Sequence, residues 1–515
     1  MQIPLRSQFA VALIIAAGFT SAASATTYDV RAFGAKGDGT TKDTAAFQKA
    51  LDTCAVNGGG DVLVPAGKYL IGSIQIGNRT ILRLEKDSIL AGSSDIADYP
   101  LTDIRWEGRW QPGHRGLIYA TAVDHIGIVG PGRIEGSVGP PPPPEAATAA
   151  APAPAPAPGG AAAPGRAGGP GRGFGGRGRS GWGTNGPDGT RNPVVIEPIS
   201  CNDVRWDGFT LTQGGNWATH PTYCTNLVVT NVSITGNRDG IDVDSCSGVR
   251  IDGCTISTGD DSISLKSGRG MDGARLGRWC EDILITNCTL SDRTFACVGI
   301  GSETSGGVRN VRIEHCKCTT GREAIYIKTR IGRAGGNENI SGDDLDVTGP
   351  TFLRLNLTQG GNNSTADDPV EGLVGYPYAR DISFSNIRVN VQTLVQGIEV
   401  SAKKPMSGLT LTNITGTCTK GISLANMSGV ALKDINVTLR PAKENEPTGP
   451  LLGIVNVTGT GLEGAVTIPA PVDPAPGNAP GGFRGGARGG PGGRGGRGGA
   501  PGVAPAAEPV PAPKQ

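Results

Sequence analysis

Three aspartates stand at spacings that could support acid–base chemistry. Asp239 is followed, a short stretch further along the chain, by the adjacent pair Asp260 and Asp261. Carboxylates that crowd one patch repel one another, so one keeps its proton near neutral pH while another stays ionised. The first can then donate a proton while the second accepts one. Alone, the Asp-Asp pair in GDDS would more simply form a turn, so this interpretation depends on whether the fold brings Asp239 beside it.

The interval between Asp239 and the pair matches an internal repeat. CTNLVVTNVSI and CSGVRIDGCTI are self-similar and begin at Cys224 and Cys246, and MSGLTLTNITG and MSGVALKDINV begin at Met406 and Met427. Short alternating strands that recur about every 20 to 25 residues are typical of a stacked solenoid. Rungs of a parallel β-helix lie about 4.8 Å apart, so Asp239 should lie on the rung next to Asp260 and Asp261. The sequence therefore predicts an all-β fold, a single-stranded parallel β-helix.

The first element before the strands is a predicted helix. The segment Thr41–Cys54 carries apolar residues at helical spacing, and we expect it to cap the open first edge of the stack. Strand patterns then continue to about Pro441, interrupted by an irregular excursion over about Leu355–Tyr378, and LLGIVNVTG is expected to close the stack.

Composition divides the chain further. The 83 glycines and 38 prolines are concentrated in two Pro, Ala, Gly and Arg-rich segments, 140–190 and 466–515, which cannot bury enough apolar surface to fold and are predicted to be disordered. The β-helix is then expected over 26–139 and 191–465. The net charge of the chain is +1, and most of the excess arginine lies in these two segments. The folded part therefore offers no strongly basic surface, and no nucleic-acid partner is expected.

The N-terminus has the features of a signal peptide. Arg6 precedes an apolar run from Phe9 to Phe19, and Ala23-Ser24-Ala25 fits a cleavage site. The run is too short to span a bilayer. We therefore expect a secreted or periplasmic protein without a membrane anchor.

Eleven cysteines remain to be explained. An exported chain could oxidise them, but Cys254, Cys288 and Cys316 recur at equivalent repeat positions, which favours stacked inward thiols over disulfides. Zinc-ligand spacing is lacking, and no metal or cofactor is expected.

Six further segments follow one another along the chain. They are YDVRAFGAKGDG from Tyr28, NWATHPTYC from Asn216, NRDGIDVDSC from Asn237, TGDDSISLKSG from Thr258, GIGSETSGGVRNV from Gly299 and IKTRIGRAGG from Ile327. Together these segments resemble the polygalacturonase family, glycoside hydrolase family 28. The resemblance runs in order from about Tyr28 to Leu439, apart from the insert. It implies a right-handed, pectin-lyase-like β-helix and inverting hydrolysis of galacturonic-acid linkages in pectin.

The resemblance also implies roles. Asp260 corresponds to the general acid, and Asp239 with Asp261 to the pair that activates water. Two family positions are altered, because the histidine of Gly-His-Gly falls on Ala296 and the arginine of Arg-Ile-Lys falls on Tyr326. Inverting glycosidases hold their two carboxyl groups about 6.5 to 9.5 Å apart, with room for a water.

Several further residues are candidates for substrate binding. Lysine and arginine pair with uronate carboxylates, whereas Tyr326 in place of a cation would weaken such binding and favour a neutral sugar. His220 and Phe295 could line the cleft or simply pack. The candidate substrate-binding residues are Lys328, Tyr326, Arg330, Lys266, His220, Asn237 and Phe295.

Other functions compete with a secreted pectic hydrolase. The altered positions leave room for a non-catalytic carbohydrate-binding or wall-adhesion β-helix, and the architecture also suits a calcium-dependent lyase, although the acids form no convincing calcium cage. The Arg-Gly tail resembles RNA-binding segments, but a linker or adhesive tail fits an exported chain better. We expect a monomer that acts on a pectic polysaccharide or oligosaccharide, with the backbone and exo or endo mode left open.

Overall fold

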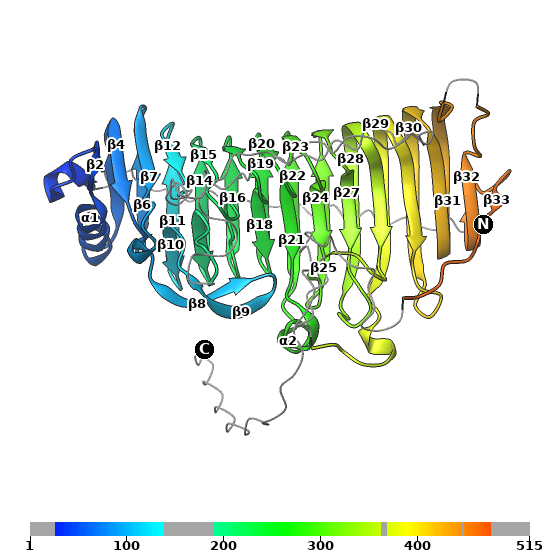
Figure 1. Cartoon of the computed structure of the whole chain (residues 1–515), viewed down its shortest axis with the longest axis horizontal. Coiled ribbons are helices and arrows are strands. Elements are labelled where there is room, and N and C mark those ends of the chain that lie inside the picture. The colour runs from blue at the N-terminus through cyan, green and yellow to red at the C-terminus, as the bar shows by residue number, and fades with distance from the viewer. Residues whose placement is uncertain (1–25, 138–189, 362–367, 444–445, 475–515) are drawn as a thin grey trace, which may run out of the picture.

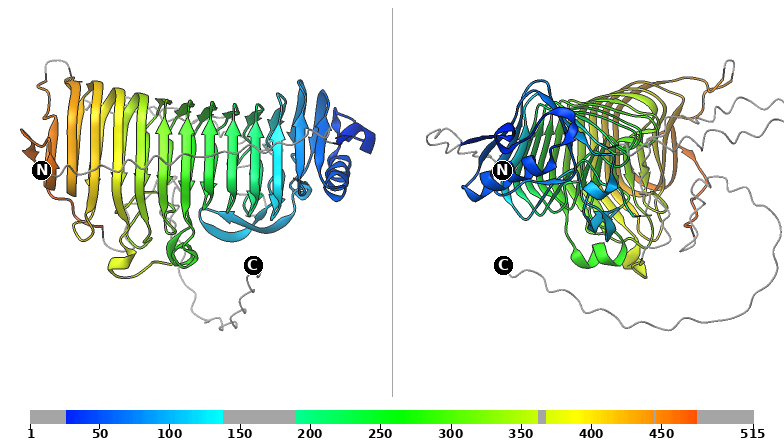
Figure 2. Two further views of the ribbon diagram at one scale, coloured as in Figure 1. Left: turned by 180° about the vertical axis from the view of Figure 1, so that it is seen from behind. Right: turned by 60° about the vertical axis from the view of Figure 1, so that its left-hand side comes forward.

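The strands stack into a right-handed parallel β-helix, as predicted (Figure 1). This computed structural model describes residues 26–137, 190–361, 368–443 and 446–474. The predicted signal segment and nearly all of the predicted insert lie outside the described residues. Figure 2 shows the coils stacked along one axis, with the first coils at one end and the last at the other.

The described coils build three parallel ladders. One runs through β1 Thr27–Asp29, β3 Gly60–Val64, β6 Thr80–Leu84, β11 Asp124–Val129, β14 Asn202–Asp207, β16 Thr225–Thr230, β19 Ser247–Asp252, β22 Cys280–Thr286 and β25 Val308–Glu314. A second runs through β2 Asp38–Lys42, β4 Gly67–Ile71, β7 Ser88–Gly92, β12 Arg133–Glu135, β15 Thr210–Thr212, β17 Ser233–Thr235, β20 Thr255–Thr258, β23 Thr289–Asp292 and β26 Lys317–Thr319.

The third ladder carries the candidate acids. It comprises β5 Ile74–Gln75, β10 Ile118–Thr121, β13 Ile196–Ile199, β18 Ile241–Asp244, β21 Ile263–Lys266, β24 Ala296–Gly301 and β27 Glu323–Lys328. Bridges at Thr219 and Thr222 fill the rung between β13 and β18. In the last coils the ladders fuse into long strands, β28 Gly336–Asn356, β29 Tyr378–Glu399, β30 Met406–Cys418 and β31 Lys420–Leu439.

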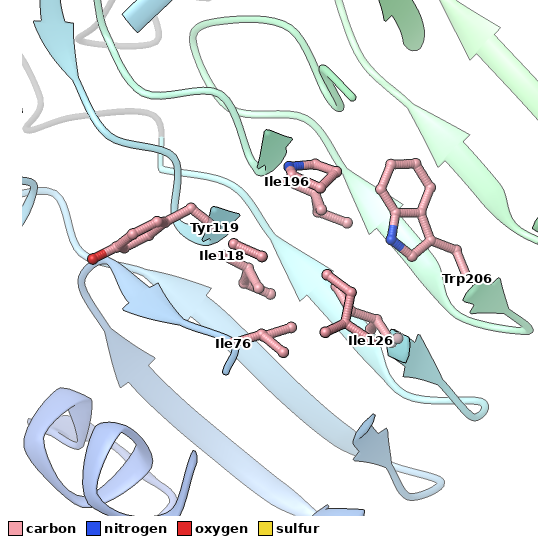
Figure 3. Close-up of a pocket in the computed structure, with 10 residues that line it drawn as sticks. Ile76, Ile118, Tyr119, Ile126, Ile196 and Trp206 are labelled. Carbon is pink, nitrogen blue, oxygen red and sulfur yellow. The ribbon is translucent and has the colours of Figure 1, made fainter. Parts of the chain in front are cut away.

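Alternation along each strand explains the core. In β16 Leu227 and Val229 are fully buried, whereas Val228 between them is 37% exposed. Since every coil turns its apolar residues inward, stacking gives one continuous hydrophobic core. Figure 3 shows this interior near the start of the stack, where Ile118, Ile126 and Trp206 face one another and Tyr119 of the same strand as Ile118 points away. All eleven cysteines are buried and free, which confirms the stacked-thiol interpretation.

The ends of the stack differ in how they are covered. The predicted cap is α1 Thr44–Val56, which begins slightly later than expected and buries Phe47 against Tyr69 with ring centroids 5.3 Å apart. At the other end β32 Leu452–Thr460 forms from the LLGIVNVTG segment. It pairs with β33 Val466–Thr467, so a short strand lies just beyond the boundary at 465 that the composition suggested.

Two excursions leave the coils on the side of the third ladder. Strands β8 Leu101–Trp106 and β9 Arg109–His114 form an antiparallel hairpin that the sequence patterns did not reveal. It runs along the stack toward the short helix α2 Gly270–Leu276 (Figures 1 and 2). The predicted excursion between β28 and β29 contains a single 3-10 turn, η4 Leu373–Gly375, among its described residues. Further 3-10 turns are η1 Val30–Phe33 and η2 Ile96–Asp98.

Candidate active site

The predicted placement of the acids on adjacent rungs is what the structure shows. The Gly240 N–H donates to the Asp261 carbonyl at 3.0 Å, which sets Asp239 in line with Asp261 across one rung. The ladder then continues with Asp242 beside Ser264. Asp239 and Asp261 are 6% and 2% exposed, and Asp260 is half-buried. Stacking thus concentrates three carboxylates in the bends that directly precede the neighbouring strands β18 and β21.

Asp261 is held by contacts to one of its two oxygens. Its Oδ2 accepts hydrogen bonds from Ser264 Oγ at 2.9 Å and from Lys328 Nζ at 2.6 Å. The lysine lies on β27, two rungs away, and its side chain must cross the β24 rung to reach the aspartate. A Cβ at Gly299 on that rung would lie 2.4 Å from Asp261 Oδ2, so only glycine leaves room for the pair.

The other carboxylate oxygen of Asp261, Oδ1, is not used in these contacts. Among the described residues Asp261 Oδ1 is buried and has no hydrogen-bond partner. A buried acceptor without a partner costs about 1 to 3 kcal/mol, and a bound molecule that donates a hydrogen bond to it would remove this cost. This oxygen is therefore available to accept a proton from a bound molecule.

Asp260, the residue before Asp261, has a strongly raised pKa. Burial, and then the charges of Asp239 and Asp261, raise the pKa of Asp260 to about 8, although Lys328 opposes the shift. Asp260 is thus protonated at neutral pH. A carboxyl group that keeps its proton near neutral pH is suited to act as a general acid.

A fourth carboxylate, which the sequence analysis overlooked, completes the charge balance. Lys266 Nζ lies 3.3 Å from Asp239 Oδ2 and forms an ion pair with Asp242, which is completely buried. Burial and then the charge of Asp239 raise the pKa of Asp242 well above its usual range. Burial also raises the pKa of Asp239, while Lys266 lowers it. These two carboxyl groups and Lys266 therefore form one buried charged cluster.

His220, a predicted cleft residue, is buried instead. Its side chain is 1% exposed, its Nε2 lies 3.6 Å from Asp244 Oδ2, and its ring packs edge-on against Trp217. Burial lowers the pKa of His220 even though Asp244 opposes the shift. Asp244 itself is fixed by Arg105 of the hairpin, at 2.7 Å from Nε to Oδ2. His220 therefore supports the wall of the site and does not line an open cleft.

The other predicted binding residues fall around the acids in different ways. Tyr326 is 4% exposed and lies between two cations, Lys328 at 5.4 Å and Arg354 at 5.3 Å from its ring centroid. Both cations already pair with carboxylates, Lys328 with Asp261 and Arg354 with Glu323 at 3.0 Å. Arg354 also pairs with Glu399 at 2.7 Å. A uronate carboxylate over Tyr326 would have to compete with these pairs.

Three further candidates lie at the margin. The half-buried Phe295 ring is 5.3 Å from Lys328 Nζ. Asn237 is exposed and accepts a hydrogen bond from Arg293. Arg330 donates to the carbonyls of Gly360 and Gly361, at 3.3 and 2.8 Å, which ties it to the excursion after β28. Phe295 therefore borders the acid cluster, while Asn237 and Arg330 belong to its surrounding loops.

Comparison with known proteins identifies the family of the chain and agrees with its fold. Residues 166–431 match the profile of Glycosyl hydrolases family 28, and residues 27–83 match that of Rhamnogalacturonase A/epimerase, pectate lyase-like. The first match covers just over half of the chain. The chain therefore belongs to glycosyl hydrolase family 28, and it is a polygalacturonase-like glycosidase.

Individual relatives are similar over most of the chain. A probable polygalacturonase of Vitis vinifera is 29% identical over 399 residues, which cover 74% of this chain and 72% of the relative. The exopolygalacturonase of Thermotoga maritima superposes with a TM-score of 0.61 at 23% identity, over 79% of this chain and 92% of that one. A family 28 exopolygalacturonase of Yersinia enterocolitica gives a TM-score of 0.60 at 17% identity, over 84% and 78%. These two structures support the β-helix fold.

Replacement of Gly299 tests the packing around Asp261. Gly299→Ala would place a methyl group against the Asp261 carboxylate and displace it from Lys328. Because misplacing a reacting group by about 1 Å can cost on the order of 10²-fold, we expect glycosidase activity to fall by about that factor. Gly449→Ala, where nothing lies within 4 Å of the added atom, is the matched control. Near-normal activity of Gly299→Ala, with an unchanged unfolding temperature, would contradict the proposed geometry.

Proposed function

We propose that this chain is an exported glycosidase that hydrolyses galacturonic-acid-containing pectic chains with inversion of configuration. The observation that carries the proposal is the contrast between two adjacent acids. Asp260 keeps its proton near neutral pH, and Asp261 is bound by Lys328 through one oxygen and offers the other. Membership of glycosyl hydrolase family 28 supports the proposed substrate class.

The proposed reaction moves two protons. Asp260 donates its proton to the glycosidic oxygen as the bond to the anomeric carbon breaks. Asp261, through Oδ1, and Asp239 accept a proton from a water that attacks the anomeric carbon from the opposite face. The products are a new reducing end, inverted at that carbon, and a freed hydroxyl on the leaving sugar. Lys328 holds Asp261 in place, and Lys266 opposes the rise that burial causes in the pKa of Asp239.

Asparagine substitutions separate this proposal from a binding role. We expect Asp260→Asn and Asp239→Asn to abolish the release of reducing ends, because each removes a group that must exchange a proton. The substrates are defined oligogalacturonates and backbones that alternate a uronate with a neutral sugar, and NMR of the first product from the wild-type enzyme reads its anomeric configuration. Oligosaccharide binding without turnover by the wild-type chain would favour the adhesion alternative. Turnover by either variant would refute the roles assigned here.

The pH profile follows from the raised pKa of Asp260. A general acid must be protonated, so kcat/KM should fall as the pH rises through about 8. A profile that stays flat through this range would contradict Asp260 as the acid.

The raised pKa of Asp260 also affects stability. A carboxyl group whose pKa is raised on folding stabilises the fold at low pH, and this contribution is lost as the pH rises through the pKa of the folded state. Asp260→Asn should therefore unfold at a temperature equal to or above that of wild type above pH 8.

Export is the remaining part of the proposal. No helix among the described residues is long and apolar enough to cross a membrane. The predicted cleavage site after Ala25 implies that protein recovered outside the cytoplasm begins at Thr26. N-terminal sequencing of that material checks the site, and an intact Met1 would contradict it.

A further inference from the structure

The β8–β9 hairpin lies over the outward face of the third ladder, from the rungs before Asp239 to the end of β21. It leaves the stack before β10 and runs parallel to the axis as far as the start of α2 (Figures 1 and 2). At its tip Glu107 accepts from Arg269 at 2.8 Å. A Cβ at Gly108 would lie 2.9 Å from the Arg269 side chain, so the tip and the residue before α2 are in close contact.

Two side chains fasten the hairpin to the rungs beneath it. Arg105 binds Asp244 with both Nε and Nη2, at 2.7 and 3.3 Å, and both residues are almost completely buried. Trp106 stacks on Trp217 with ring centroids 3.8 Å apart. A buried ion pair with two contacts and an aromatic stack hold the hairpin firmly.

The hairpin contacts two neighbouring rungs here, because Asp244 lies on β18, the rung of Asp239, and Trp217 lies on the rung directly before it. The Ala218 N–H donates to the Asp239 carbonyl at 3.0 Å, so Trp217 precedes Asp239 in the same outward column. Lys266 Nζ, which contacts Asp239, also lies 3.9 Å from the centroid of the Trp217 ring. Trp217 therefore stands between the acid cluster and the hairpin.

Burial shows that this side of the groove is filled by protein. Outward residues of an open groove would be exposed to solvent, but Trp217 and His220 on the rung before Asp239 are 5% and 1% exposed. On the C-terminal side of the acids Tyr326 is 4% exposed, and further along the side chains of Arg354 and Glu399 keep 16% and 14% of their surface. The groove is thus filled by protein directly before Asp239.

We propose that the hairpin ends the substrate groove beside Asp239, so that the enzyme removes short products from one end of a pectic chain. This inference rests on the proposed hydrolase function and specifies how the same site selects its bond. A polysaccharide cannot continue past the Trp106–Trp217 stack, so the sugars on that side of the broken bond must be the last of their chain.

Product lengths at low conversion test the proposal. Wild-type enzyme acting on long oligogalacturonates should release only mono- and disaccharides from the outset, and reducing ends should accumulate while the viscosity of a polymer solution hardly falls. A wild-type enzyme that releases longer oligomers at once would overturn the inference while leaving the hydrolase function intact. Absence of any hydrolysis would instead count against the function proposed above.

A hairpin variant tests the cause. Arg105→Ala combined with Trp106→Ala removes both anchors, and the early products should shift to three or more sugars. Asp103→Ala, an exposed position on the same hairpin, should keep the wild-type pattern. If the double variant fails to fold, a hairpin shortened between Leu101 and His114 provides the same measurement. A folded variant of either kind that still releases only short products would overturn the assignment of the hairpin as the wall.

Discussion

Four carboxyl groups on two neighbouring rungs repel one another, and two lysines make their coexistence possible. Lys266 lies among Asp239 and Asp242, and Lys328 reaches Asp261 from two rungs away. Burial alone would lower the pKa of Lys328, but Asp261 and Asp260 outweigh it and keep the ammonium charged. Removing one partner of such a buried pair leaves an uncompensated charge, which is more costly than never forming the pair. The charge state of the whole cluster therefore depends on these two ammonium groups.

Small residues on β24, the rung between Asp261 and Lys328, leave room for this ion pair. The outward positions of this rung are Ala296, Gly299 and Gly301, in register with Glu323, Tyr326 and Lys328. Larger side chains there would separate the lysine from the aspartate. The contacts that order Asp261 come from Ser264 and Lys328 on the two rungs that adjoin this one.

Regular features of the chain could be predicted from its sequence, and departures from the repeat could not. The interval between Cys224 and Cys246 equals the interval between Asp239 and Asp261, and the register of a solenoid follows directly from its repeat length, so these two acids had to be neighbours. Asp242 was overlooked although the alternation in DGIDVD offered a signal, since it sets Asp242 and Asp244 on the outward face of β18. The hairpin follows no repeat, and Arg105 is far from its partner Asp244 along the chain. The burial of His220 depends on that distant contact.

The hairpin also changes how the acids behave, beyond its effect on access. Water that screens charges on an open sheet face is displaced where Trp106 covers Trp217, and Lys266 is left between an aromatic ring and two carboxylates. In such surroundings the interactions among charges grow stronger. Burial is accordingly the first cause of the raised pKa of Asp239, Asp242 and Asp260. The fold thus accepts the free-energy cost of burying repelling acids, and a protonated carboxyl group at neutral pH is the direct result.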